Sequence, residues 1–194
     1  DEGQVLLDGK PLSEYKGYCP VQLIWQHPQE AVNPRRKMKT VLEEGGVLDE
    51  RLIHGLGIEK EWMERYPGEL SGGELQRFCI ARALGEKTSF LLADEITAML
   101  DLITQSQIWN FLLEEVRSRE IGLLVVSHSE PLLQRICTGR IQLWSSCRTY
   151  IKILLSADIK KYTDPDIDRV FCRCRWISNR IIVDKRRSMK HGCA

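Results

Sequence analysis

Two adjacent acids, Asp94 and Glu95, come directly after the apolar run 90–93. Carboxylates at the end of such a run are costly to bury without a partner, and a bound Mg²⁺ ion would offset that cost. In phosphoryl transfer one acid binds the metal ion, while another polarises or positions the attacking water. We therefore expect Asp94 to bind Mg²⁺ and Glu95 to act as the catalytic base. The alternative is that the pair caps the next helix.

The glycine-containing turn 70–74, with the sequence LSGGE, is a second candidate for phosphate binding. The spacing of Ser71 and Glu74 is that of a capping box, so helix initiation alone would explain these two residues. Caps do not need the two glycines between them, whereas the close approach of a phosphate to a helix N-terminus does. Together with the two acids, Gly72 and Gly73 therefore favour nucleotide chemistry.

His128 and Gln26 each follow an apolar stretch that predicts a strand, 121–126 and 21–25 respectively. Ligands of α/β sheets bind at the carboxyl ends of the strands, so we expect His128 on the same edge as the two acids. The alternative is an ordinary loop histidine. A glutamine at a strand end is usually only polar surface, and the residues alone assign no role to Gln26.

Helical patterns alternate with apolar strands along the chain, which predicts an α/β fold. We expect strands at 4–12 (with a turn at 8–9), 21–25, 90–93, 121–126 and 140–144. We expect helices at 37–44, 48–54, 59–65, 75–84, 104–119 and 129–137. The region from about 30 to 84 would therefore form a small helical subdomain, and the nearly continuous apolar strands favour a parallel sheet core.

Charge divides the chain into two parts. The net charge is +1, from 28 Lys and Arg against 27 Asp and Glu. Residues 145–194 hold 12 Lys and Arg against 5 Asp and Glu, so the acidic excess lies in 1–144. We therefore predict a main domain at 1–144 and a basic C-terminal extension at 145–194. The three cysteines of 1–144 lie in apolar or helical contexts, which predicts reduced core thiols and a cytosolic setting.

The extension is open to several interpretations. Its stretch 171–176 mixes cysteine, arginine and aromatic residues. The two cysteines of this stretch, with the distant His191 and Cys193, make a poor zinc pattern. The basic excess and Trp176 suggest nucleic-acid binding. The plainest alternative is a poorly ordered or out-of-frame extension, and the partner of this extension stays unassigned.

Five motifs in order resemble those of the nucleotide-binding subunits of ABC transporters, specifically the peptide/nickel importers. Residues 70–84 (LSGGELQRFCIARAL) resemble the family's signature motif with its following helix. The others are similar to the Walker B strand (90–95, FLLADE), the D-loop (98–101, AMLD), the Q-loop (24–28, IWQHP) and the H-switch (124–128, LVVSH). Asn33-Pro34-Arg35 is typical of the peptide/nickel branch. The resemblance covers about 1–144 and implies a P-loop NTPase-like fold, that of the ABC ATPases.

The resemblance also implies roles for the residues of the signature motif. Ser71, Gly72 and Gly73 would contact the γ-phosphate of a nucleotide that the opposite subunit of a head-to-tail dimer holds. Glu74 is assigned to the nucleotide site with them. Asp101 would help to set the geometry of the dimer interface.

Two further residues gain a role only from the resemblance. His128 would act as the sensor of the γ-phosphate. Gln26 would bind Mg²⁺ or water and act as a relay to the membrane subunit.

The protein that the resemblance implies is the ATP-hydrolysing subunit of an importer for peptides, nickel or a similar small solute. ATP and Mg²⁺ would be its cofactors. A second ABC ATPase subunit and transmembrane permease subunits would be its partners, and no nucleic acid is expected. It would lie peripherally at the cytoplasmic face of the inner or plasma membrane.

The sequence departs from the family in one respect that affects activity. It contains no GxxxxGK[ST] run, whose backbone and lysine hold the phosphates in P-loop NTPases. In the family this loop lies upstream of the strand that begins here at Gln4, and the chain has no initiator Met, so we expect an N-terminally truncated, incomplete fold. Ile96 stands where the family often has proline, with little effect expected.

Two alternatives follow from the missing loop and the basic extension. The chain could be a non-catalytic subunit that only contributes its signature motif to a partner's ATP site. It could also be a soluble ABC-type protein that acts on nucleic acid.

Overall fold

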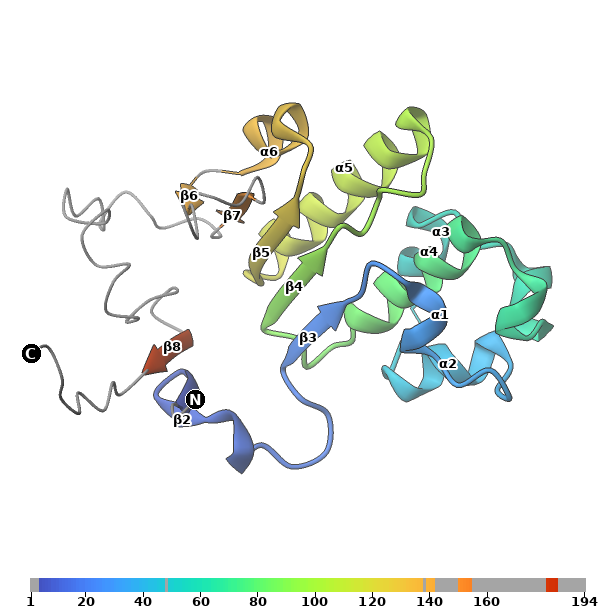
Figure 1. Cartoon of the computed structure of the whole chain (residues 1–194). Helices are drawn as coiled ribbons and strands as arrows, with labels where there is room; N and C mark the ends of the chain where they lie inside the picture. The colour runs from blue at the N-terminus through green and yellow to red at the C-terminus, as the bar shows by residue number, and fades with distance from the viewer. Residues whose placement is uncertain (1–3, 48, 138, 142–149, 155–180, 185–194) are drawn as a thin grey trace, which may run out of the picture. The chain divides into compact units, whose positions relative to one another are not determined.

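A computed structural model describes residues 4–47, 49–137, 139–141, 150–154 and 181–184 of the chain (Figure 1). The chain divides into two compact units, and each is described here by itself. One unit comprises residues 1–19 and 159–194, and the other comprises residues 20–158. In the described part of the chain, no helix is long and apolar enough to cross a membrane.

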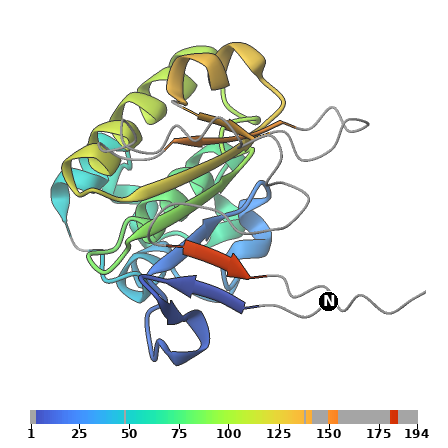
Figure 2. The ribbon, with the colours of Figure 1, turned by 90° about the vertical axis from the view of Figure 1, so that its left-hand side faces the viewer.

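The first unit contains a three-stranded antiparallel sheet. Strand β1 (Gln4–Leu7) pairs with β2 (Lys10–Pro11) on one side and with β8 (Ile181–Asp184) on the other, as Figure 2 shows for β1 and β8. Asp8 and Gly9 join β1 to β2, and both have a positive φ, of 51° and 78°. This is the backbone that a two-residue hairpin turn requires, which confirms the predicted turn. A 3₁₀ helix, η1 (Leu12–Glu14), follows β2.

The second unit is built on a five-stranded sheet. Strands β3 (Val21–Ile24), β4 (Phe90–Asp94) and β5 (Gly122–Ser127) lie side by side and parallel (Figure 1). Strand β7 (Tyr150–Leu154) pairs antiparallel with β5, and β6 (Gly139–Ile141) pairs antiparallel with β7. The predicted α/β fold with a parallel sheet core is therefore confirmed.

All the helices of the predicted helical subdomain lie between β3 and β4. They are α1 (Pro28–Ala31), α2 (Met38–Glu44), α3 (Glu50–Gly55), η2 (Lys60–Glu64), η3 (Pro67–Glu69) and α4 (Gly72–Ala83). Helix α1 was not predicted. Helix α4 begins three residues before the predicted start because the cap at Ser71 allows both glycines into its first turn. The segment 60–64 forms a 3₁₀ helix.

Two further helices belong to the second unit, and both were predicted. Helix α5 (Leu102–Ser118) joins β4 to β5, and α6 (Glu130–Ile136) follows β5. A Ser129 side chain caps α6, as expected from its sequence.

The extension contributes a strand to each unit. Residues 151–155 were interpreted as the start of a strand or a helix, and the structure shows the strand β7 there. Strand β8 was not predicted. The stretch 171–176, His191 and Cys193 lie outside the described residues. The predicted boundary at residue 144 stays a prediction.

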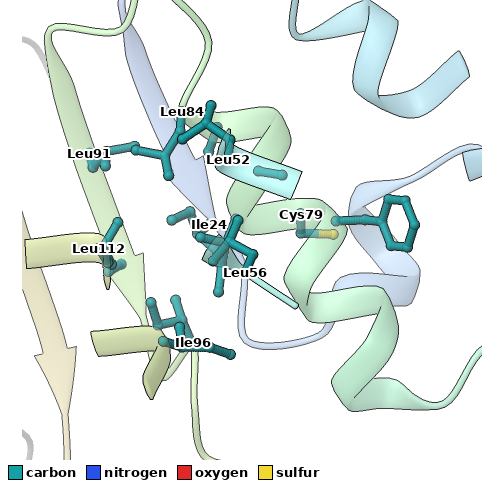
Figure 3. Close-up of a cluster of buried hydrophobic side chains, with 14 of the residues drawn as sticks. Ile24, Leu52, Leu56, Cys79, Leu84, Leu91, Ile96 and Leu112 are labelled. Atoms are coloured by element: carbon teal, nitrogen blue, oxygen red, sulfur yellow. The ribbon is translucent and has the colours of Figure 1, made fainter. Parts of the chain in front are cut away.

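One face of the parallel sheet packs against the helices. Figure 3 shows buried side chains from β3, α3, α4, β4 and α5 in one cluster, among them Ile24, Leu84, Leu91 and Leu112. Cys79 lies in this cluster and is 2% exposed. Burial raises the pKa of its thiol to about 11, so Cys79 is a neutral core residue at physiological pH, as predicted.

Helix α5 also holds the helical subdomain through polar contacts. The carboxylate of Glu115 is fully buried and accepts two hydrogen bonds from the guanidinium of Arg51 on α3. Arg119 donates to the carbonyls of Leu84 and Gly85 at 2.6 Å each. A buried carboxylate needs such a partner, because an unpaired charge is costly in the interior.

We predict that the two faces of β4 differ in their contribution to stability. The fully buried Leu91 packs in the helix-covered core, whereas Leu92 is only half-buried. Leu91→Ala should lower the free energy of unfolding by about 2–5 kcal/mol, as is usual for a buried leucine. Urea unfolding would measure this change, with Leu92→Ala as the matched control. An equal or larger loss for Leu92→Ala would contradict the assignment of the core face.

Candidate functional site

The carboxyl ends of the three parallel strands meet at one edge of the sheet (Figure 1). In the register of the sheet, Ala93 is the partner of both Ile24 and Val125. Gln26 and Glu95 each lie two residues further along the chain, just beyond the ends of β3 and β4, and β5 ends at Ser127. The sheet therefore brings these polar residues to the same edge, because parallel strands in register end at the same level.

Glu95 is held by the end of the neighbouring strand. Its Oε1 accepts a hydrogen bond from the backbone N–H of His128 at 2.6 Å, and the Nε2 of that histidine lies 3.4 Å from the same oxygen. The backbone N–H of Glu95 donates to the carbonyl of Val126 at 3.0 Å. The carboxylate is 10% exposed, whereas the His128 side chain is 67% exposed. The structure thus brings the two predicted catalytic residues together.

The backbone of Glu95 is unusual for a side-chain-bearing residue. Its φ is +49°, in the left-handed region that residues other than glycine rarely adopt. Such strain costs about 1–3 kcal/mol and persists only where the surroundings enforce it. At this position, the contacts with Val126 and His128 enforce it.

Ser127 belongs to this group although the sequence analysis assigned it no role. Its hydroxyl lies 3.4 Å from Oε2 of Glu95, to which it donates, and accepts the backbone N–H of Ser129 at 3.2 Å. The signal in the sequence was its place at the end of an apolar strand, directly before the candidate histidine.

Asp94 and Gln26 are the predicted ligands of Mg²⁺. Both side chains are half-buried, and neither makes a hydrogen bond or ion pair with the residues that the structure describes. In those same residues, no three His, Cys, Asp or Glu side chains gather as a metal site. Mg²⁺ needs only one or two protein oxygens when waters and phosphates complete its shell. The free oxygens of Asp94 and Gln26 therefore fit this ion.

The start of α4 forms the capping box that the sequence predicted. Ser71 Oγ accepts the N–H of Glu74 at 3.3 Å, and Glu74 Oε2 accepts the N–H of Ser71 at 2.7 Å. The N–H groups of Gly72 and Gly73 come next in the first turn and have no intrahelical acceptor. Two backbone donors therefore remain for an anion.

The two glycines of the turn differ in how closely their surroundings pack. A Cβ atom there would lie 2.8 Å from Cδ2 of Leu100, so α4 begins directly against the segment that precedes α5. At Gly72 a Cβ would meet Met99 Sδ at an ordinary 3.6 Å. A larger residue at position 73 would therefore require the end of the Leu100 side chain to shift.

Asp101 is the N-cap of α5. Its Oδ1 accepts the backbone N–H groups of Ile103 and Thr104 at 3.0 Å each. A hydrogen bond with the Thr104 side chain, together with these backbone bonds, lowers the pKa of Asp101. The carboxylate assigned to a dimer interface therefore also starts a helix.

Thr97 fixes the loop after Glu95, and the sequence analysis missed it. It is 3% exposed, and its Oγ1 accepts Gln105 Nε2 at 2.8 Å and Trp109 Nε1 at 3.0 Å. Gln105 and Trp109 are four residues apart on α5, so they share one helix face. That spacing of two polar groups was the signal in the sequence that could have indicated a shared partner.

Comparison with known proteins identifies the family. Residues 1–98 match the ABC transporter family, which is just over half of the chain. The chain belongs to the ABC transporter family.

Named ABC transporter proteins show the same relationship. The chain is 35% identical over 162 residues to the nickel import ATP-binding protein NikD of Pseudomonas putida, covering 76% of the chain and 62% of NikD. It is 30% identical over 157 residues to the oligopeptide transport ATP-binding protein OppF of Streptococcus mutans, covering 70% of the chain and 50% of OppF. The chain thus spans less than two thirds of each relative's length.

Solved structures agree with the fold. The ATP-binding cassette MJ0796, determined as a dimer in a post-hydrolysis state with ADP and Pi, matches with a TM-score of 0.56 at 21% identity. The match covers 68% of this chain and 65% of that one. This likeness supports the predicted P-loop NTPase-like fold, while the roles of the single site residues stay predictions.

We predict that the cap at Asp101 makes stability depend on pH. The folded-state pKa lies below the ordinary value near 3.8 because hydrogen bonds favour the carboxylate. The stabilisation is therefore present at neutral pH and is lost as pH falls through the lowered pKa. In thermal unfolding, wild type should exceed Asp101→Asn at pH 7, and the gap should close in acid. A gap that is unchanged between pH 7 and acid pH would contradict this cause.

Proposed function

We propose that this ABC transporter chain is the ATP-binding and ATP-hydrolysing part of an importer for peptides, nickel or a similar small solute. The named relatives support the solute class, because they are nickel import and oligopeptide transport ATP-binding proteins. The chain would lie at the cytoplasmic face of the inner or plasma membrane, against transmembrane permease subunits.

The observation that carries the proposal is the contact of Glu95 with the end of β5. The backbone of His128 and the hydroxyl of Ser127 hold the Glu95 carboxylate at the edge of the sheet where the parallel strands end. A base held in this way can orient a water molecule and accept its proton without rearranging. His128 places a largely exposed imidazole beside it, where a γ-phosphate could contact Nε2.

Asp94 and Gln26 would hold Mg²⁺ next to the base. When bound, this ion would neutralise charge on the phosphate oxygens. The two side chains have hydrogen-bonding capacity to spare among the described residues, which suits them as ligands.

The second ABC ATPase subunit would dock head-to-tail against the start of α4. The open N–H groups of Gly72 and Gly73 would face its nucleotide, with Ser71. Met99, Leu102 and Ile103 follow close by and are 54%, 81% and 73% exposed. Exposed apolar side chains in succession suit a protein interface.

A non-catalytic subunit is the second candidate. Residues 1–194 contain no GxxxxGK[ST] run to hold the β- and γ-phosphates. The signature turn of α4 is nevertheless fully formed, with its capping box. In this alternative the chain completes the ATP site of a partner and hydrolyses nothing itself.

We predict that Glu95→Gln stops hydrolysis and retains ATP. The test uses a version of the chain preceded by a GxxxxGK[ST] loop, because the base acts only on a held nucleotide. Loss of a general base should lower kcat by about 10²–10⁴-fold. Glu86→Gln, an exposed glutamate outside the proposed site, is the matched control. Unchanged turnover in Glu95→Gln would refute the base assignment.

A direct titration tests the consequence of the missing loop. MgATP is titrated calorimetrically into the purified 194-residue chain. Because the sequence lacks the loop, the affinity should not be better than millimolar. Tight binding would show that these residues hold ATP by another route, and would remove the reason for the non-catalytic candidate.

We predict that Glu74→Gln strengthens nucleotide binding at the signature turn. Glutamine also completes a capping box, so α4 should start unchanged. Removing a negative charge beside the open N–H groups should favour a phosphate by about two- to five-fold in the dissociation constant. The apparent affinity for MgATP would be measured in a mixture with a loop-bearing ABC ATPase subunit. Weaker binding would mean that the Glu74 charge itself serves the site.

A further inference from the structure

Three side chains of α4 donate to three backbone carbonyls of the segment 25–31. Gln76 Nε2 donates to the Trp25 carbonyl at 3.2 Å, and Arg82 Nη1 donates to that of Ala31 at 2.8 Å. Between them, Cys79 Sγ lies 3.9 Å from the Pro28 carbonyl. The donors are three residues apart on α4, and so are the acceptors on the segment. We call these contacts the carbonyl ladder.

The shortness of α1 accounts for two of the three contacts. A helix of four residues cannot satisfy its last carbonyls internally, so those of Pro28 and Ala31 need donors from elsewhere, whereas Trp25 lies before the helix. Residues three apart on α4 share one face, and that face packs against α1. Gln76 and Cys79 are 4% and 2% exposed.

The contact between Gln76 and the Trp25 carbonyl lies next to Gln26, a predicted ligand of Mg²⁺. The Trp25 carbonyl belongs to the peptide bond that leads into Gln26. The Gln26 side chain makes no hydrogen bond with the residues that the structure describes. Its position therefore depends on its backbone, and Gln76 holds the peptide group before it.

Burying the Gln76 side chain is unfavourable in free energy, and packing alone does not explain why a glutamine stands there. Its Oε1 is buried and has no hydrogen-bond partner in the described part of the chain. A buried acceptor without a partner is unfavourable, and an apolar side chain of the same length would avoid this cost. The donated hydrogen bond is the feature that an apolar residue could not supply.

We propose that Gln76 is a positioning residue that places Gln26 at the edge of the sheet. The same helix carries Ser71, Gly72 and Gly73 at its start, so the ladder joins the signature turn to Gln26. A shift of α4 on binding a partner's nucleotide would move Gln26 in the chain's own site. The roles of Gln26 and the signature turn in this statement rest on the proposed function.

The first experiment is amide hydrogen exchange of the full 194-residue chain by NMR. Gln76→Met keeps the length of the side chain and removes the donor. The Gln26 amide should exchange several-fold faster, because the peptide group that contains it is no longer fixed through its carbonyl. The amides of α4 and the melting temperature should stay unchanged. Gln134→Met, on the exposed surface of α6, is the matched control and should change neither quantity.

Two outcomes would overturn the positioning role. One is unchanged exchange at Gln26, and the other is a global loss of stability with uniformly faster exchange. If Gln76→Met fails to fold, the wild type decides: the side-chain amide protons of Gln76 should exchange far more slowly than those of Gln134. Equal rates would refute the hydrogen bond between the Gln76 side chain and the Trp25 carbonyl.

The second experiment separates this inference from the proposed function. Mg²⁺ binding with ATP is measured in the loop-bearing version for Gln26→Ala, Gln76→Met and the double variant. If Gln76 acts through Gln26, the double variant should bind like Gln26→Ala alone. If the losses of Mg²⁺ affinity in the two single variants add up in the double variant, the inference is wrong. If no variant loses Mg²⁺ affinity, while the Gln26 amide of Gln76→Met exchanges faster, the metal role of Gln26 is refuted. The positioning role of Gln76 then still stands.

Discussion

The structure depends on the register of the three parallel strands β3, β4 and β5. Ile24, Ala93 and Val125 are neighbours in that register, so the polar residues after each strand end at one edge. Parallel strands need crossover connections, and here these connections are the helical subdomain and α5. Residues far apart in sequence therefore lie side by side in the site, as Glu95 and His128 show with 33 positions between them in numbering.

Helix α4 has two separate tasks in this arrangement. Its first turn presents the N–H groups of Gly72 and Gly73, while its later turns support the backbone of residues 25–31 through the carbonyl ladder. A helix is stiff over this length, so the two ends cannot move independently. The capping box at Ser71 then serves both tasks, because it sets where the helix begins.

The loop after Glu95 shows how a strained backbone is kept in place. Thr97 accepts two hydrogen bonds from α5, and the Glu95 carboxylate accepts one from the His128 backbone. Together these contacts hold the left-handed backbone at Glu95. The strained backbone lies at the predicted catalytic site, and such conformations are common at functional sites.

The sequence by itself determined the local structure of this protein. Apolar runs predicted β3, β4 and β5, and the spacing of Ser71 and Glu74 predicted the cap of α4, because these signals involve residues close together along the chain. The order of the motifs also indicated the ABC transporter family and both members of the Glu95–His128 pair. Only the tertiary structure decided which residues hold that pair, that β7 enters the sheet between β5 and β6, and that Gln76 supports Gln26. Those contacts join residues far apart in sequence, and no local pattern specifies their geometry.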